Sequence, residues 1–101
     1  MTPLAVIVSA RDRLPVALSV AAAAAALGRD VAMLFDGGSV TALFDADAAL
    51  TTALELGVRV TACQTGLAEV GLAASLLPDG VEAGGMVGFL RAHADAQWLL
   101  A

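Results

Sequence analysis

The sequence is poor in charged and aromatic residues, and it contains neither lysine nor tyrosine. Charged residues make up 15% of the 101-residue chain, against about 25% in a typical globular domain. The five basic residues are all arginines and face ten acidic residues, so the formal net charge is -5 at pH 7. Nucleic-acid binding relies on a basic patch that releases counterions, so we expect no nucleic-acid partner.

Only one cysteine, Cys63, and one histidine, His93, are present. An intramolecular disulfide is therefore impossible, and His93 has no second histidine with which to bind a metal or form a catalytic dyad. The histidine is better explained as a structural residue near the end of the last helix. The sequence also lacks the Gly-rich nucleotide-binding patterns, and the missing lysine excludes a P-loop. We expect neither a metal nor a cofactor.

Long hydrophobic runs are absent, although apolar residues supply 59% of the chain and about a quarter of it is alanine. The longest run, 14–27, falls short of the roughly 20 residues that a membrane helix needs. The N-terminal residues do not have the basic segment of a secretory signal. We therefore expect a cytoplasmic single domain over 1–101 that does not enter the membrane. With so few charges to cover its surface, a compact homo-oligomer is expected.

Strand-like and helix-like segments alternate along the chain. Apolar, largely β-branched runs predict strands, and capping residues, alanine-rich stretches and terminating glycines predict helices. This alternation is typical of an α/β domain with a mainly parallel sheet and helices on both faces. The predicted strands are 4–8, 31–35, 58–62, 81–83 and 97–100, and the predicted helices are 14–27, 47–56, 64–71, 72–77 and 86–93.

The carboxyl ends of the strands are the expected place for a ligand, because open parallel sheets bind ligands there. The loops at that edge are 9–13, 36–38 and 63–66. If the strand order is 2-1-3-4, as in flavodoxin-like folds, a crevice lies between the first and third strands. Arg11 and Arg13 would then lie close to Cys63.

At that position the Cys63 thiol has two alternative roles. The amides of the following helix and a guanidinium would favour the thiolate, which is the nucleophilic form. Free cysteine is also one of the most buried residue types, so Cys63 could equally be a small core residue.

Gly37 and Gly38 also have two interpretations: their backbone amides could bind an anion, or the two glycines could simply form a turn. Trp98 is expected in the core or in an oligomer interface.

The order of these features resembles the DsrE/DsrF-like family, most closely its DsrE2-like branch. The resemblance covers nearly the whole chain, including the alanine-rich helix that ends at 26–28 and the strand 31–35 before a glycine turn. The most specific part is the interval from Cys63 to Gly71 and the run Leu77-Pro78-Asp79-Gly80-Val81-Glu82-Ala83-Gly84-Gly85. Two features depart from the branch pattern, namely Gln64-Thr65-Gly66-Leu67 after the cysteine and a shorter loop after the second strand.

The resemblance implies a flavodoxin-like three-layer sandwich, assembly into a trimer or hexamer, and a role in sulfur relay between donor and acceptor proteins. By position, Cys63 would carry the sulfur as a persulfide. Arg11 and Arg13 would stabilise the thiolate or an anionic acceptor, and the amides of Gln64, Thr65 and Gly66 would hold the terminal sulfur.

Two alternatives remain beside the relay. One is a non-enzymatic oligomeric module that binds a small ligand or a partner. The other is a peroxide-reducing thiol enzyme, which is disfavoured because no acid, base or Thr/Pro-Cys arrangement surrounds Cys63.

Overall fold

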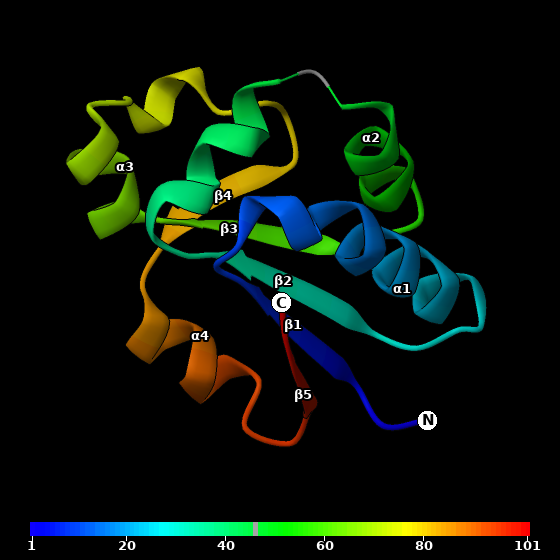
Figure 1. Ribbon diagram of the computed structural model, residues 1–101. Coiled ribbons are helices and arrows are strands. Elements are labelled where there is room, and N and C mark those ends of the chain that lie inside the picture. The colour runs from blue at the N-terminus through cyan, green and yellow to red at the C-terminus, as the bar shows by residue number, and fades with distance from the viewer. Residues whose placement is uncertain (46) are drawn as a thin grey trace.

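Five parallel strands form one sheet in the order β4-β3-β2-β1-β5 (Figure 1). The computed structural model describes residues 1–45 and 47–101. The strands are β1 (Leu4–Val8), β2 (Val31–Phe35), β3 (Arg59–Cys63), β4 (Val81–Gly84) and β5 (Gln97–Leu100). The predicted α/β fold with a mainly parallel sheet is thus confirmed.

The helices lie on both sides of this sheet, which makes three layers (Figure 1). The α-helices are α1 (Leu14–Ala26), α2 (Ala48–Glu55), α3 (Gln64–Val70) and α4 (Met86–Ala92). Short 3-10 helices are η1 (Arg11–Arg13), η2 (Gly37–Phe44) and η3 (Ala74–Leu76). We call the side of the sheet covered by α1 and α2 the α1 face, and the opposite side the α4 face.

The side taken by α4 follows from the handedness of the connections. From β1 to β4 the chain moves across the sheet in one direction, and it then returns past all of these strands to place β5 beside β1. Parallel crossovers are right-handed in about 98% of cases, so a reversed direction puts the connecting helix on the opposite face. α4 is short, and it is the helix that crosses this face.

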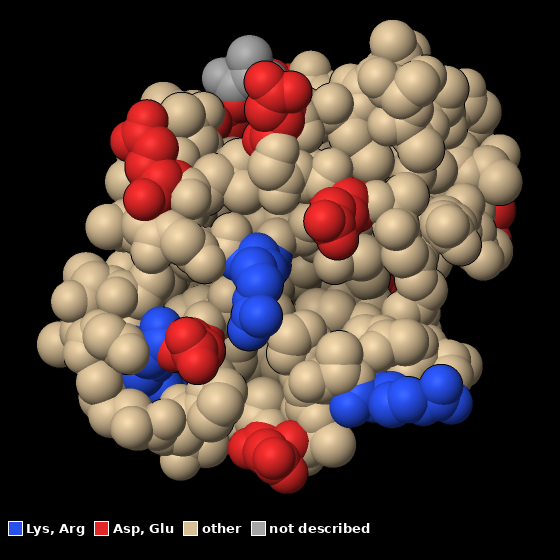
Figure 2. All heavy atoms as spheres, turned by 180° about the vertical axis from the view of Figure 1, so that it is seen from behind, with Lys and Arg blue, Asp and Glu red and all other residues tan. Residues whose placement is uncertain are grey.

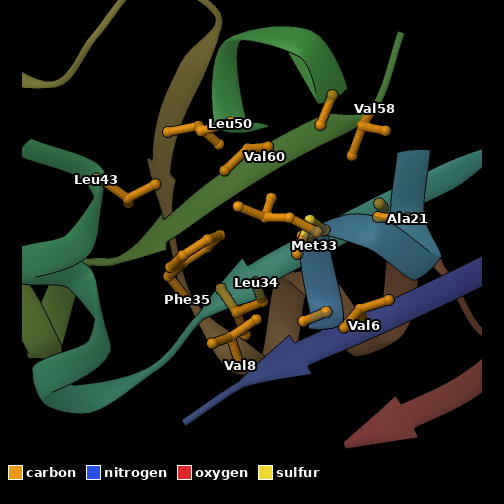
Figure 3. Packing of buried hydrophobic residues seen from close by; sticks show 14 of the residues in the cluster. Val6, Val8, Ala21, Met33, Leu34, Phe35, Leu43, Leu50, Val58 and Val60 are labelled. Carbon is orange, nitrogen blue, oxygen red and sulfur yellow. The ribbon is translucent and has the colours of Figure 1, made fainter. Parts of the chain in front are cut away.

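The main core lies between the sheet and the α1 face. Figure 3 shows Val6, Met33, Phe35 and Val60 pointing from the strands toward α1, α2 and η2. Leu34 points to the other face, as the two-residue period of a strand requires (Figure 3). β2 is buried along its whole length because strands lie on both of its sides and helices on both faces.

Local signals in the sequence explain where the helices begin and end. The Asp47 side chain accepts a hydrogen bond of 2.7 Å from the Ala49 amide and so caps α2. Pro15 lies in the first turn of α1, where its missing amide costs nothing. Gly71 ends α3 in the left-handed conformation with φ 71°.

The strand order differs from the order 2-1-3-4 on which the expected crevice depended. β2 lies between β1 and β3, so no crevice separates the first and third strands. The periodicity of each segment is local and does not encode which strand is its neighbour. Smaller differences are that β3 extends to Cys63, that 74–76 is a 3-10 turn within the predicted helix 72–77, and that the unassigned 40–44 belongs to η2.

No helix within 1–45 and 47–101 is both long enough and apolar enough to cross a membrane. Figure 2 shows basic side chains standing apart from one another on a mostly uncharged surface. On the face seen there, they do not gather into the kind of patch that nucleic-acid binding uses.

Candidate functional site

Cys63 is the last residue of β3 and the residue that precedes the first turn of α3. Its backbone remains extended, with φ -64° and ψ 121°. Alternation along β3 therefore places its side chain on the α4 face, together with Arg59 and Thr61. The residue is buried, with 7% of its surface exposed, and its thiol is free.

The neighbour of Cys63 on β4 is Gly84, which pairs with it in register. Since glycine carries no side chain, β4 places no side-chain atoms beside the thiol. The small exposed fraction of Cys63 contrasts with the complete burial of Phe35 and Met33 on the adjacent strand. The thiol is therefore at the rim of the core instead of in its centre.

The neighbour on the other side of Cys63 is acidic. Asp36 has an extended backbone, and its amide donates a 2.8 Å hydrogen bond to the Val8 carbonyl, which continues the pairing of β1 with β2. Extending the pairing of Phe35 with Ala62 by one residue aligns Asp36 with Cys63. Sequence reasoning missed Asp36 because it interpreted 36–38 either as amides that bind an anion or as a glycine turn, and gave the carboxylate no role.

Arg11 and Arg13 are placed away from the position predicted for them. The Arg11 guanidinium forms an ion pair with Asp45 and donates a 2.7 Å hydrogen bond to Thr41 Oγ1. Both partners belong to the segment around η2, whose Leu43 packs on the α1 face (Figure 3). Arg13 is exposed at the start of α1.

β2 separates the loop after β1 from Cys63, by two strand spacings or roughly 10 Å. The expectation that these arginines neighbour the thiol depended on a strand order that the chain does not adopt.

The glycine loop and the start of α3 do come together. A Cβ atom on Gly66 would lie only 2.6 Å from the Gly37 carbonyl oxygen, so the two backbones are in close contact. Gly66 is buried by this contact, whereas Gln64, Thr65 and Gly38 are exposed. Two of the three loops expected at the carboxyl edge, 36–38 and 63–66, thus lie in contact, and Gly37 and Gly66 are used there for packing.

His93 packs on the α4 face, with its ring 4.6 Å from that of Phe89 between centroids. Burial, and then repulsion by Arg59, lower the pKa of His93 from its ordinary value. Trp98 on β5 makes an edge contact with Phe89 at 6.3 Å and keeps 38% of its surface exposed. In the described part of the chain, no three potential metal ligands gather in one place.

The fold itself is shared with solved structures of other proteins. The ychN protein from E. coli superimposes with a TM-score of 0.85 at 21% identity, over 99% of this chain and 98% of its own. A protein of unknown function, MTH1491 from Methanobacterium thermoautotrophicum, gives 0.81 at 18% identity over the full length of both chains. The conserved protein of unknown function BT1422 from Bacteroides thetaiotaomicron gives 0.77 at 18% identity, over 99% of this chain and 95% of its own.

No protein-family model matches the chain, and no curated protein matches it either. The structural similarity at these identities defines the class of fold, a three-layer α/β domain with a parallel sheet.

Proposed function

We propose that this chain is a sulfur-binding or sulfur-relay protein of the DsrE/DsrF-like type, which carries a persulfide on Cys63. The observation that carries the proposal is the position of Cys63. It ends an inner strand at the carboxyl edge of a parallel sheet, and a side-chain-free residue, Gly84, lies beside it. Ligands of open α/β sheets bind at that edge.

The proposed reaction transfers one sulfur atom without net oxidation. The Cys63 thiolate attacks the outer sulfur of a donor persulfide, a new S–S bond forms, and the donor leaves as its thiolate. An acceptor thiolate then attacks the outer sulfur of the Cys63 persulfide and regenerates the Cys63 thiolate. The chain has no second cysteine to resolve the persulfide internally. Donor and acceptor must therefore be other molecules, which we propose to be proteins of the same cytoplasmic compartment.

Gln64 and Thr65 are the residues proposed to hold the terminal sulfur. Both are exposed and directly follow Cys63, and the first amides of a helix have no acceptor inside it. Gly66 contributes less than its sequence position predicts because it is packed against Gly37. We assign no role in the proposed step to Arg11, which is bonded to Asp45 and Thr41, or to Arg13, whose loop follows a strand that β2 separates from β3.

The test is intact-mass measurement after incubation with an inorganic polysulfide. We expect a gain of one sulfur atom that is removed by dithiothreitol and is absent in Cys63→Ser. Because the thiol is 7% exposed, iodoacetamide should react more slowly with the folded chain than with the chain in urea. Unchanged mass in excess polysulfide, with full labelling in urea, would contradict the relay.

A second candidate function is an oligomeric binding module without chemistry, and the surface around β5 supports it. Large apolar side chains are exposed there and on α4, with Leu100 at 74% and Val87 at 70%. β5 is also an edge strand with one unpaired side. Such surfaces are usually covered by a partner. A trimer or hexamer built through this surface is the proposed assembly.

Light scattering distinguishes the assembly from a monomer. We expect the wild-type mass to be a multiple of the 10.0 kDa chain, and Leu100→Glu to shift it toward the monomer. Asp12→Asn, an exposed change on η1, is the matched control and should leave the mass unchanged. A wild-type monomer at high concentration would contradict the proposed assembly.

A further inference from the structure

A hollow of about 510 Å³ lies between α4 and the edge of the sheet formed by β3 and β4. Its size falls within the range of small-molecule sites, about 300–1,000 Å³. The residues that give it chemical character come from three elements that are distant in sequence. They are Arg59 and Thr61 on β3, Glu82 on β4, and Phe89 and His93 on and just after α4.

The strand register brings one cation and one anion to this hollow. Thr61 pairs with Glu82, and Arg59 lies two residues before Thr61, so all three side chains are on the α4 face. Strand spacing and rise place the Cα atoms of Arg59 and Glu82 about 8 Å apart on the diagonal. Within the described ranges neither side chain forms an ion pair or a side-chain hydrogen bond. Both charges are free to bind a ligand.

Two glycines, Gly85 and Gly88, line the hollow at positions where neither packing nor backbone conformation requires glycine. A Cβ atom on Gly85 or Gly88 would meet no atom within 4 Å, and neither residue has a positive φ. Gly88 lies inside α4, where glycine costs about 1 kcal/mol relative to alanine. Packing and backbone conformation would both accept alanine at this position. What glycine provides is free volume beside Phe89.

The apolar lining of the hollow includes Leu54, Val58 and Phe89. Phe89 is 5% exposed and anchors α4 to the sheet. His93 packs against its ring in a tilted arrangement, so the imidazole is held at the side where Arg59 lies. With the pKa of His93 lowered, the imidazole is neutral at pH 7, and the charges of Arg59 and Glu82 balance. A neutral hollow with separated charges favours a ligand that is also neutral with separated charges.

We propose that this hollow binds a small α-amino acid as its zwitterion, with the carboxylate on Arg59 and the ammonium on Glu82. The imidazole of His93 donates a hydrogen bond to the carboxylate, and the ligand's side chain packs on Phe89 in the space left by Gly88. A ligand with only a negative charge would be repelled by Glu82, and a ligand with only a positive charge would be repelled by Arg59. Binding of the amino acid at this site does not depend on the reaction proposed for Cys63.

The test is titration of the 15N-labelled full chain, followed by the amide signals of Gly84, Gly85 and Gly88. The probes are L-leucine and L-glutamine, with isocaproate and isoamylamine as the leucine analogues that lack the ammonium and the carboxylate. We expect saturable shifts with at least one amino acid, and at least tenfold weaker binding of both analogues. No saturable shift with either amino acid, or isocaproate binding as tightly as L-leucine, would overturn the proposal.

Variants separate ligand contact from folding. Arg59→Gln and Glu82→Gln should each weaken binding at least tenfold, whereas the exposed controls Arg91→Gln and Glu69→Gln should leave it unchanged. Gly88→Ala should abolish binding while its melting temperature stays equal to or above that of the wild type. Retained binding in Gly88→Ala would contradict the role of the open space. Cys63→Ser should bind normally, so a failure of the sulfur relay would leave this proposal standing.

Discussion

Gly84 and Thr61 are in such close contact that a Cβ atom on Gly84 would lie 2.9 Å from Cγ2 of Thr61. The contact joins β4 to β3 on the α4 face, because Gly84 lies two residues beyond Glu82, the residue that pairs with Thr61. It holds the edge strand close to the strand that carries Cys63. The absence of a side chain at Gly84 thus serves both the packing of the edge strand and the open space beside the thiol.

The Gly84–Thr61 contact predicts an energetic coupling between the two positions. Gly84→Ala should lower the free energy of unfolding by about 1–2 kcal/mol through overpacking. Adding Thr61→Ser removes the clashing methyl group, so the double variant should recover about 1 kcal/mol relative to additivity. Urea unfolding of the wild type, both single variants and the double variant measures this. Strictly additive effects would mean that the methyl group is not the obstacle.

Gly66→Ala should be more destabilising than Gly84→Ala. The atom that the new methyl group would meet is the Gly37 carbonyl oxygen, at 2.6 Å, and a backbone atom cannot move away as a side chain can. We expect a loss of about 2–3 kcal/mol. Gly38→Ala is the control, since a Cβ there meets nothing within 4 Å. An equal stability of the two variants in urea would argue against close packing of α3 on η2.

Arg11 and Asp45 should contribute little to stability although they form an ion pair. Their side chains are 52% and 49% exposed, so water and salt screen the attraction. Asp45→Asn should therefore change the free energy of unfolding by less than about 1 kcal/mol. The change should shrink further at high salt. A large, salt-independent loss would show instead that this pair holds η1 against η2.

Acidification should destabilise the folded chain through His93. Burial and Arg59 lower its folded pKa below the ordinary value of 6.5, so the unfolded chain takes up the proton first. Stability is thus fully present above about pH 6.5, and it falls as the pH drops toward the folded pKa.

Urea unfolding at stepped pH measures this loss, which should be smaller in His93→Gln. The charged groups facing this side chain are Arg59 and Glu82, so Arg59→Gln should also reduce the loss. An identical pH dependence in wild type and His93→Gln would assign the effect to other groups.

The segments of the fold could be predicted from the sequence because their signals are local. The apolar runs at 4–8 and 31–35 match β1 and β2 residue for residue, and Asp47 caps α2 as expected. The position of Cys63 at the carboxyl end of the third strand was also predicted correctly. These features depend on the residues within a few positions of one another, which a single sequence displays.

The neighbours of Cys63 could not be predicted in the same way. Whether Arg11 or Asp36 lies near the thiol depends on whether β1 or β2 pairs with β3, and either order fits the same hydrophobic pattern. The hollow beneath α4 was missed for the same reason. Arg59, Glu82 and His93 are separated by other elements, and only the alternation of polar residues at 59 and 61 signalled a polar strand face.

The sequence alone determined the chemistry that is available: one thiol, five guanidinium groups, a single imidazole, and an alternation of strands and helices that closes into a parallel sheet. Tertiary structure decided which of these groups meet. It placed β2 between the arginine loop and Cys63, paired Arg11 with Asp45, and sent α4 to the opposite face, where Arg59, Glu82 and His93 share a hollow. The physical reason is that strand order and helix side follow from crossover handedness and long-range packing, and neither leaves a periodic signal in the chain.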